Sequence, residues 1–276
     1  AKSPVKKIEI EHWEGLLDWE LDQLPNLKYV LALGNYALHA LTGDSGITKW
    51  RGSVFDCLVG TSRRKVKAIV TNNPAHVMRN MSFEPMYKFD LAKLRRVLDG
   101  KFKQHDINAT INPTYDDATR YLGELERSSA PIAFDIEIVA NETACIGFAN
   151  NAHSGISINF RDSTTNRYSV DEERLLRERI QRLLSDNRHK FIAQNGSFDC
   201  GWLWYKDRIK VPSIWFDTLL AHHTLYPSMP HNLAYLTAQY TDHPYYKDEG
   251  KTWREGGNID QFWEYNVKDC CITWAC

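Results

Sequence analysis

Two carboxylates lie close together on one predicted strand. Residues 131–138, PIAFDIEI, place apolar and polar side chains on alternating faces, as is typical of a strand. Asp135 and Glu137 are two positions apart, so both side chains emerge on the same face. Two like charges this close repel each other unless a cation lies between them. Because the strand is otherwise apolar, the pair is as consistent with a metal site as with a solvated surface pair.

A third acid follows another predicted strand, KFIAQ (190–194). Asn195 and Asp199 are four residues apart at the start of the next predicted helix, which places them on one helical face. Asp199 therefore lies near the carboxyl end of a strand, where open α/β sheets bind their ligands. By itself this pattern is weak evidence, because the same spacing on an exposed helix usually marks a solvated face.

The fourth acid belongs to a helix predicted over residues 259–275. Tyr265 and Asp269 are four residues apart and share a face of that helix. Alone, a tyrosine one turn before an acid is usually a packing residue whose hydroxyl group reaches water.

In this order, the three acidic segments resemble the three motifs of the DEDD-superfamily 3′–5′ exonucleases, in their tyrosine (DEDDy) subclass. The segment FDTLLAHHTLYPSMPHNLAYLTAQYT (216–241) is also similar to the proofreading domain of phage-type, family-A DNA polymerases related to DNA polymerase I. The resemblance covers about residues 114–276. One departure is Ile138, where these proteins often have threonine, and it adds or removes no metal ligand.

The resemblance implies a metal-dependent 3′–5′ exonuclease that hydrolyses DNA with two divalent ions, Mg²⁺ or Mn²⁺. By resemblance, Asp135 bridges both ions. Glu137 and Asp269 complete the site that activates water, and Asp199 holds the second ion.

The resemblance also assigns the residues around the metals. Tyr265 orients the attacking water rather than acting as a base, and Asn195 and Phe198 shape the pocket for the terminal nucleotide. The expected substrate is a single-stranded or frayed 3′ end of DNA. The expected fold is ribonuclease H-like, with a mixed sheet flanked by helices, over residues 106–276. A polymerase domain is expected after Cys276.

The N-terminal segment resembles the C-terminal half of family-4 uracil-DNA glycosylases. The matching stretches are KYVLALGNYALHALTG (28–43), ITKWRGSVF (47–55) and AIVTNNPAHVMRN (68–80). This resemblance implies a partial, Rossmann-like α/β domain over residues 1–105. Asn73 stands where the family usually has a histidine before proline, and His76 is no simple replacement. We therefore expect no glycosylase activity.

Other elements must hold these residues in place. Residues 85–98 are predicted to form a helix, and residues 100–113 a connector. Two capping boxes predict helix starts: Thr114 with Asp117, and Ser169 with Glu172. Residues 131–160 are predicted to form an antiparallel meander that contains the first acidic pair.

Composition limits the remaining functions. The chain has 34 basic and 35 acidic residues, which argues against broad electrostatic coating of nucleic acid. Residues 63–67 (RRKVK) are as consistent with a DNA contact as with a solvated surface, whereas helix 174–182 (RLLRERIQR) is expected to be a solvated face.

None of the six cysteines forms a CxxC pair. This favours a reducing compartment, the cytoplasm, which is that of a bacterial host if the protein is phage-encoded. No apolar run is long enough to span a membrane. Because the chain lacks an initial methionine, we expect it to be cut from a longer polymerase.

Two alternatives remain. An RNA-trimming exonuclease of the ribonuclease D kind shares the same acids. A degenerate nuclease could persist as a catalytically silent DNA-binding module, although the complete acid set argues against it.

Overall fold

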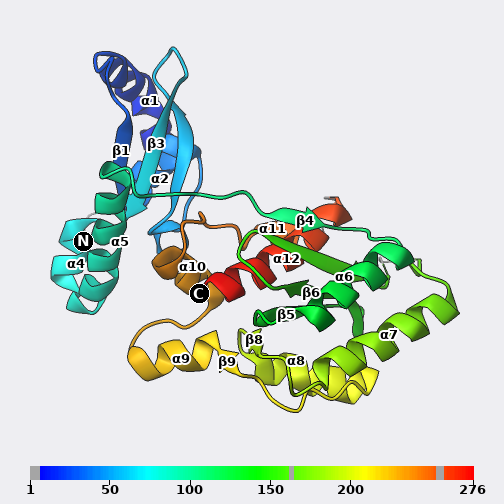
Figure 1. The fold of residues 1–276 in the computed structure, drawn as a ribbon. Coiled ribbons are helices and arrows are strands. Elements are labelled where there is room, and N and C mark those ends of the chain that lie inside the picture. Colours follow the sequence, from blue (N-terminus) through cyan, green and yellow to red (C-terminus); the bar gives the residue numbers. More distant parts are fainter. Residues whose placement is uncertain (1–6, 162–164, 253–257) are drawn as a thin grey trace. The chain divides into compact units, whose positions relative to one another are not determined.

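The computed structural model describes residues 7–161, 165–252 and 258–276, and it divides into two compact units (Figure 1). Unit 1 comprises Ala1–Gln104 and Thr237–Tyr245. Unit 2 comprises His105–Leu236 and Tyr246–Cys276. All acids singled out above therefore belong to unit 2. The domain boundary after residue 105 and the glycosylase-like character of the first domain stay predictions.

Unit 1 is built on a three-stranded mixed sheet of order β1-β3-β2. β1 pairs with β3 in parallel, and β2 pairs with β3 in the antiparallel sense. The strands are β1 (Tyr29–Leu33), β2 (Val54–Val59) and β3 (Arg64–Thr71). Its helices are α1 (Lys7–Asp22), α2 (Asn35–Thr42), α3 (Ile47–Trp50), α4 (Pro74–Arg79), the 3₁₀ turn η1 (Met81–Phe83) and α5 (Glu84–Leu98).

Hydrogen bonds from α5 tie the segment 237–245 to unit 1. The Lys93 ammonium donates to the carbonyl of Ala238 at 2.6 Å. The Arg96 guanidinium donates to both carboxylate oxygens of Asp242, each at 3.0 Å. Such bidentate pairs fix geometry as well as charge. The residues on both sides of this segment in the sequence belong to unit 2, but the segment itself packs as part of unit 1.

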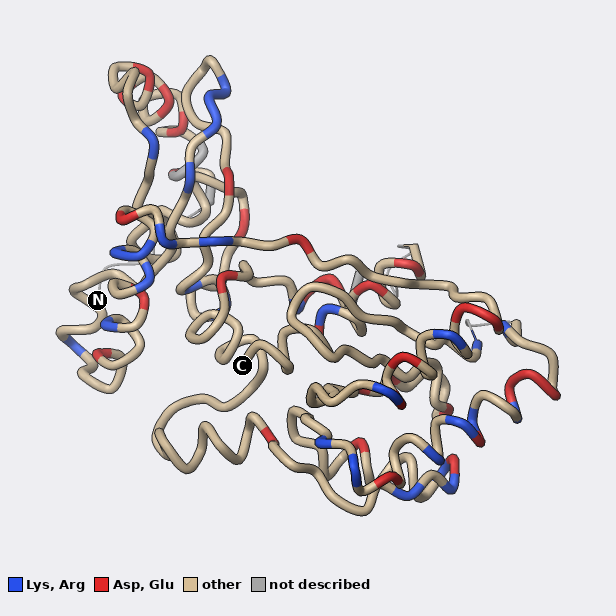
Figure 2. Tube along the Cα trace, in the orientation of Figure 1, with Lys and Arg blue, Asp and Glu red and all other residues tan. Residues whose placement is uncertain are grey.

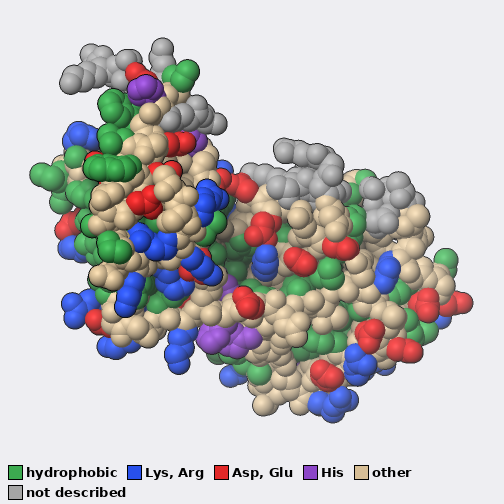
Figure 3. Space-filling view, turned by 90° about the horizontal axis from the view of Figure 1, so that it is seen from above, with side chains coloured by type: hydrophobic (Ala, Val, Ile, Leu, Met, Phe, Trp, Pro, Cys, Tyr) green, Lys and Arg blue, Asp and Glu red, His purple; other side chains and the backbone are tan. Residues whose placement is uncertain are grey.

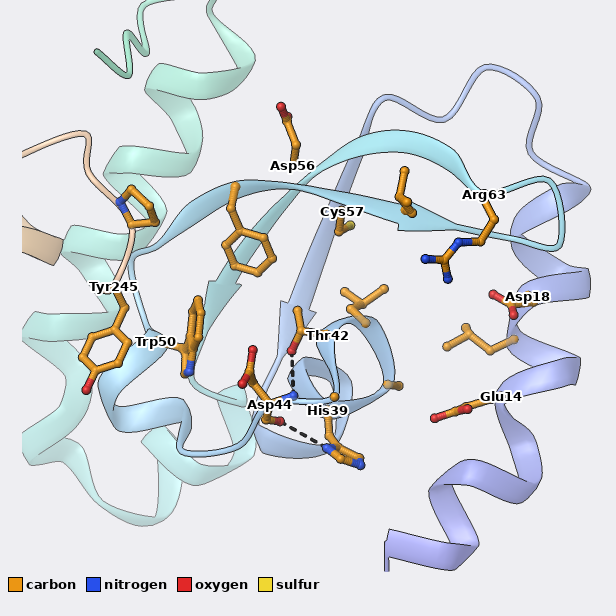
Figure 4. Close-up of a pocket in the computed structure, with 17 residues that line it drawn as sticks. Glu14, Asp18, His39, Thr42, Asp44, Trp50, Asp56, Cys57, Arg63 and Tyr245 are labelled. Carbon is orange, nitrogen blue, oxygen red and sulfur yellow. Dashed lines mark hydrogen bonds between the residues drawn. The ribbon is translucent and has the colours of Figure 1, made fainter. Parts of the chain in front are cut away.

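A cavity of about 600 Å³ lies in unit 1, and Figure 4 shows its lining. Glu14 and Asp18 face it from α1, and Asp44 lies on the loop after α2. Trp50 and Tyr245 supply aromatic surface on the side opposite α1. Carboxylates outnumber basic side chains around this cavity, so its charge disfavours a phosphate ligand.

Unit 2 is built on a six-stranded mixed sheet of order β4-β7-β6-β5-β8-β9. β5, β6 and β7 form the predicted antiparallel meander, and β8 and β9 extend the sheet in parallel with β5. The short β4 lies inside the segment expected to be a connector, and it pairs in parallel with β7. The strands are β4 (Asn108–Thr110), β5 (Ile132–Val139), β6 (Glu142–Ala149), β7 (Ser154–Asn159), β8 (Phe191–Ala193) and β9 (Phe216–Asp217).

Helices cover this sheet, as the ribonuclease H-like prediction requires. α6 and α7 pack on the sheet face formed by Phe134, Ile146 and Phe148. α12 packs against the residues of β6 that alternate with these, including Cys145 and Ala149. The helices of unit 2 are α6 (Tyr115–Arg127), α7 (Val170–Leu184), α8 (Gly196–Trp202), the π turn η2 (Leu203–Asp207), α9 (Thr218–Leu225), α11 (Glu249–Thr252) and α12 (Ile259–Ala275). Helix α10 (Leu233–Tyr240) has residues in both units.

A glycine lets α12 approach the sheet closely. A Cβ atom on Gly147 would lie 2.4 Å from Oδ1 of Asn266 and 2.7 Å from Sγ of Cys270. Both distances are shorter than real Cβ contacts, so only glycine allows this spacing between β6 and α12. The helix that carries Tyr265 and Asp269 is thus held against the strands that carry the first acids.

The local signals read from the sequence are confirmed at several points. Both capping boxes form, at Thr114 and at Ser169. Along α7, the exposed Arg174 pairs with Glu178 at 2.8 Å, which fits the solvated face expected there. Arg177 is only 23% exposed and lies 4.1 Å from the centroid of the Phe160 ring, so the expectation is wrong for that side of the helix. Figure 2 shows basic and acidic residues interspersed along this helix. On the face shown in Figure 3, acidic and basic side chains both occur, and several basic side chains lie close together on its left-hand part.

Two further expectations concern location and redox state. All six cysteines are free. Among the described residues, none of the helices is both long and apolar enough to cross a bilayer.

Candidate active site

Strand β5 and helix α12 bring three of the predicted acids together. Asp135 and Glu137 emerge from the β5 face that α12 covers, and Asp269 projects from α12 itself. One carboxylate oxygen of each lies within 4.8 Å of the others. Asp269 is buried, whereas Asp135 and Glu137 are half-buried and open toward solvent. The arrangement is a compact group of oxygen ligands at the edge of the core.

The fourth acid reaches the same place from the neighbouring strand. β8 pairs with β5, and α8 begins shortly after the end of β8. Asp199, in the first turn of α8, therefore lies close to β5. Oδ1 of Asp199 accepts a hydrogen bond from the backbone N–H of Ile136 at 3.2 Å. Ile136 lies between Asp135 and Glu137, so Asp199 is adjacent to the pair.

The start of α8 is fixed by another carboxylate, at the end of β9. Asp217 accepts hydrogen bonds from the backbone N–H groups of Asn195 at 3.2 Å and Gly196 at 2.8 Å. It also caps α9 through the N–H of Leu219 at 2.9 Å. Sequence reasoning did not single out Asp217, although the resemblance over residues 216–241 covers it.

Burial and neighbouring charges perturb two of these acids, Asp135 and Asp199. Burial raises the pKa of Asp135 well above its usual value, and the charges of Asp269, Asp199 and Glu137 raise the pKa further. Burial also raises the pKa of Asp199 to about 6, against the lowering effect of the Ile136 hydrogen bond. Acids that share a site in this way either retain protons or take up a cation. Carboxylate oxygens are the ligands that Mg²⁺ and Mn²⁺ prefer, so the donor set fits a divalent metal.

A buried amide on α12 orients Asp135. Asn266 is fully buried, and its Nδ2 donates to Oδ2 of Asp135 at 3.0 Å. Its Oδ1 accepts a hydrogen bond from the Ser157 hydroxyl at 2.9 Å. Sequence reasoning missed this residue. The available signal was its position three residues before Asp269, on the side of α12 that faces the sheet.

The segment just before α11 contacts the third motif. The Tyr246 hydroxyl donates to Oδ1 of Asp269 at 2.6 Å. Lys247 Nζ donates to the Tyr265 hydroxyl at 2.8 Å and to Oδ2 of Asp269 at 2.5 Å. Sequence reasoning missed both residues, because nothing in their spacing links them to the motif.

Tyr265 remains protonated in this setting. Burial raises its pKa well above the usual value, and the negative charges of Asp269, Glu137 and Asp135 raise it further. A hydroxyl group with such a pKa can donate a hydrogen bond but cannot serve as a base near neutral pH. This fits the orienting role that the resemblance implies.

The two expected substrate contacts lie at the entrance of α8. Phe198 is 55% exposed, and its ring stacks on Trp202 with a centroid separation of 6.5 Å. Asn195 is exposed and directly precedes the helix, with a left-handed φ of 59°. The expectation that Asn195 shares a helical face with Asp199 is therefore wrong, because the chain turns at Asn195 before the helix begins.

The same segments are matched by a known family. The family model DNA_pol_A_exo1, described as a 3′–5′ exonuclease, matches residues 110–275, which is more than half of the chain. The chain belongs to this 3′–5′ exonuclease family. The match spans β5, α8 and α12, and it confirms the predicted exonuclease family. Exonucleases of the DEDD superfamily normally use divalent metals, which agrees with the carboxylate group found here.

Several solved structures are similar to this chain. The catalytic core of RRP6 from Trypanosoma brucei is 16% identical with a TM-score of 0.48, covering 63% of this chain and 48% of its own. RNase D of Escherichia coli is 17% identical with a TM-score of 0.45, covering 60% and 42%. The POL domain of Pol1 from M. smegmatis is 14% identical with a TM-score of 0.43, covering 61% and 26%. The chain thus spans less than half the length of these three. No curated protein matches it.

Proposed function

We propose that this chain removes nucleotides from the 3′ end of DNA by a two-metal-ion mechanism. The observation that carries the proposal is the convergence of Asp135, Glu137 and Asp269, with Asp199 bonded to the strand between the first two. Four carboxylates in one partly buried place are costly unless divalent cations offset their charge. Mg²⁺ or Mn²⁺ is the proposed cofactor.

Each acid has a proposed role. Asp135 would bridge two ions, Glu137 and Asp269 would complete one site, and Asp199 would complete the other. When bound there, two such ions would supply an activated water molecule and stabilisation of the leaving 3′ oxygen. Asn266 keeps the Asp135 carboxylate oriented through its amide hydrogen bond.

Residues beside the acids position the reactants. Tyr265 donates a hydrogen bond to the attacking water, since its high pKa keeps it protonated. Phe198 offers an exposed ring on which the terminal base can stack, and Asn195 lies three residues before it. These three assignments are proposals for the reaction on DNA.

The proposed substrate and context are those of a proofreading domain. The similarity of residues 216–241 to phage-type, family-A polymerases supports DNA rather than RNA, and a polymerase domain on the C-terminal side. The cytoplasm, that of a bacterial host if the protein is phage-encoded, is the proposed location.

For unit 1 we propose no glycosylase activity. Asn73 serves as a helix cap, accepting a hydrogen bond from the N–H of Ala75 at 2.9 Å. His76 is exposed and packs its ring against Phe83 at 4.7 Å. Asn73 thus has a structural role as a cap, and the proposal rests on the absence of the usual histidine at this position.

The proposal is tested with 5′-labelled single strands of DNA and of RNA with the same sequence, in Mg²⁺. The wild-type chain should produce a ladder that shortens from the 3′ end, with DNA degraded faster than RNA. Asp135→Ala should lower this rate by more than about 100-fold, because even outer metal-site partners contribute about 10- to 100-fold.

Three outcomes would overturn the proposal in different ways. Faster degradation of RNA would favour a ribonuclease D-like activity. Equal rates for wild type and Asp135→Ala would place the nuclease activity elsewhere. No degradation, together with no Mn²⁺ binding by calorimetry, would indicate a catalytically silent module.

A further inference from the structure

We propose that Lys247 is a positioning residue for the exonuclease reaction, because it fixes the direction in which the Tyr265 hydroxyl donates its proton. This inference rests on the proposed function of the acidic site and adds to it a residue outside the three motifs. Lys247 lies seven residues after the end of α10, in a segment that carries no acid of the site.

The lysine ammonium joins the two functional groups of the third motif. Nζ lies 2.8 Å from the Tyr265 hydroxyl oxygen and 2.5 Å from Oδ2 of Asp269. It also lies 4.7 Å from the centroid of the Tyr265 ring. The Lys247 side chain is 20% exposed, so water screens these contacts only in part.

Residues 246–250, which include Lys247, pack closely against the side chains of the third motif. Tyr246 donates its hydroxyl proton to the other oxygen of Asp269. A Cβ atom on Gly250 would lie 2.9–3.0 Å from three atoms of the Tyr265 ring, so the backbone at Gly250 rests against that ring. Tyr265 is therefore held between this segment and α12.

The direction of hydrogen bonding follows from the chemistry of lysine. An ammonium group has three donors and no acceptor, so the Tyr265 oxygen must accept from Lys247. The single hydroxyl proton of Tyr265 then has to be donated elsewhere. That direction includes the acids and any water they hold, which is where the attacking water is proposed to lie.

The same contact leaves Asp269 able to bind metal. A carboxylate offers about four lone-pair sites, and hydrogen bonds from Tyr246, Lys247 and Tyr265 leave one of them for a metal ion. Lys247 therefore holds the Tyr265 hydroxyl group without blocking the metal ligand that Asp269 provides.

The test compares Lys247→Met, Tyr265→Phe and the double variant, with Lys268→Met as the matched control. Lys268 is 28% exposed and ties the same segment to α12 through Glu249. Single-turnover rates are measured on 5′-labelled DNA. Lys247→Met should slow the reaction by about 10- to 100-fold, whereas Lys268→Met should change it by less than about 3-fold.

The double variant decides whether Lys247 acts through Tyr265. Adding Lys247→Met to Tyr265→Phe should slow the reaction by less than about 3-fold more, because the hydroxyl is already gone. Lys247→Arg keeps a donor and should recover part of the rate. A full additional loss in the double variant, or an equal loss in Lys268→Met, would overturn the inference.

A nuclear magnetic resonance measurement that requires neither bound metal nor nuclease activity separates this inference from the proposed function. In metal-free protein with ¹³Cζ-labelled tyrosine, Lys247→Met should shift the Tyr265 resonance, assigned with Tyr265→Phe, and Lys268→Met should not. An unshifted resonance in Lys247→Met overturns the inference even if DNA is degraded. Absence of nuclease activity in wild type, with the expected shift present, would instead overturn the proposed function alone.

Discussion

Asp199 should make the metal-free protein less stable as the pH rises. Its pKa in the folded chain is raised from 3.8 to about 6, mainly by burial. The folded state therefore binds more protons than the unfolded state between these two values. Stability is then lost as the pH increases through that window, and the loss is complete above about pH 6. Asp199→Asn removes the ionisable group and should remove this part of the pH dependence.

The expected loss of folding stability follows from the size of the pKa shift of Asp199. Each pKa unit corresponds to about 1.4 kcal/mol, so a shift of about two units corresponds to about 3 kcal/mol. The substitution keeps one oxygen that can accept the hydrogen bond from the Ile136 N–H. The folded structure should therefore be preserved while the charge is removed.

The assay is urea unfolding in EDTA at several pH values between 4 and 7.5, followed by circular dichroism. Wild type should lose up to about 3 kcal/mol more than Asp199→Asn over this range. The exposed Asp116, on the first turn of α6, provides the control Asp116→Asn, which should keep the wild-type slope. Adding Mn²⁺ above pH 6 should stabilise wild type more than Asp199→Asn, because the metal replaces the missing protons. Identical slopes in wild type and Asp199→Asn would refute the reasoning.

Three further outcomes are expected. Gly147→Ala should destabilise the protein by about 1–3 kcal/mol in urea unfolding, since its Cβ would lie 2.4 Å from Oδ1 of Asn266. Gly201→Ala, which meets nothing within 4 Å, should cost no stability, and an equal loss in both would contradict the packing argument. Thr114→Ala should lower stability by about 0.5–2 kcal/mol through loss of the α6 cap, and unchanged unfolding would show that the cap is replaced. Phe198→Ala should weaken binding of single-stranded DNA by about 1–3 kcal/mol in a fluorescence titration while leaving the melting temperature unchanged, and unaltered binding would exclude base stacking at this ring.

Local patterns predicted much of unit 2. The alternation in residues 131–138 places Asp135 and Glu137 on one face of β5, and the structure has both side chains facing α12. The capping boxes at Thr114 and Ser169 form as the sequence indicates. These features depend on residues a few positions apart, so backbone geometry alone determines them.

Contacts between distant residues were not predictable in the same way. Asn266 bonds to Asp135 across 131 residues, and Tyr246 bonds to Asp269 across 23. Such pairs depend on how α12 and the segment before α11 pack, which no local pattern encodes. The edge strand β4 was missed for the same reason, because its pairing partner β7 lies more than 40 residues away. Asn195 was misplaced because a left-handed residue before α8 interrupts the helical spacing.

The measurement that tests the central claim most directly is anomalous diffraction from crystals soaked with Mn²⁺ and a deoxynucleoside monophosphate. The account predicts two manganese peaks that share Asp135, one also bound by Glu137 and Asp269 and the other by Asp199. Crystals of Asp135→Ala should lose at least one peak. Manganese bound away from these four acids, or none in wild-type crystals, would contradict the account.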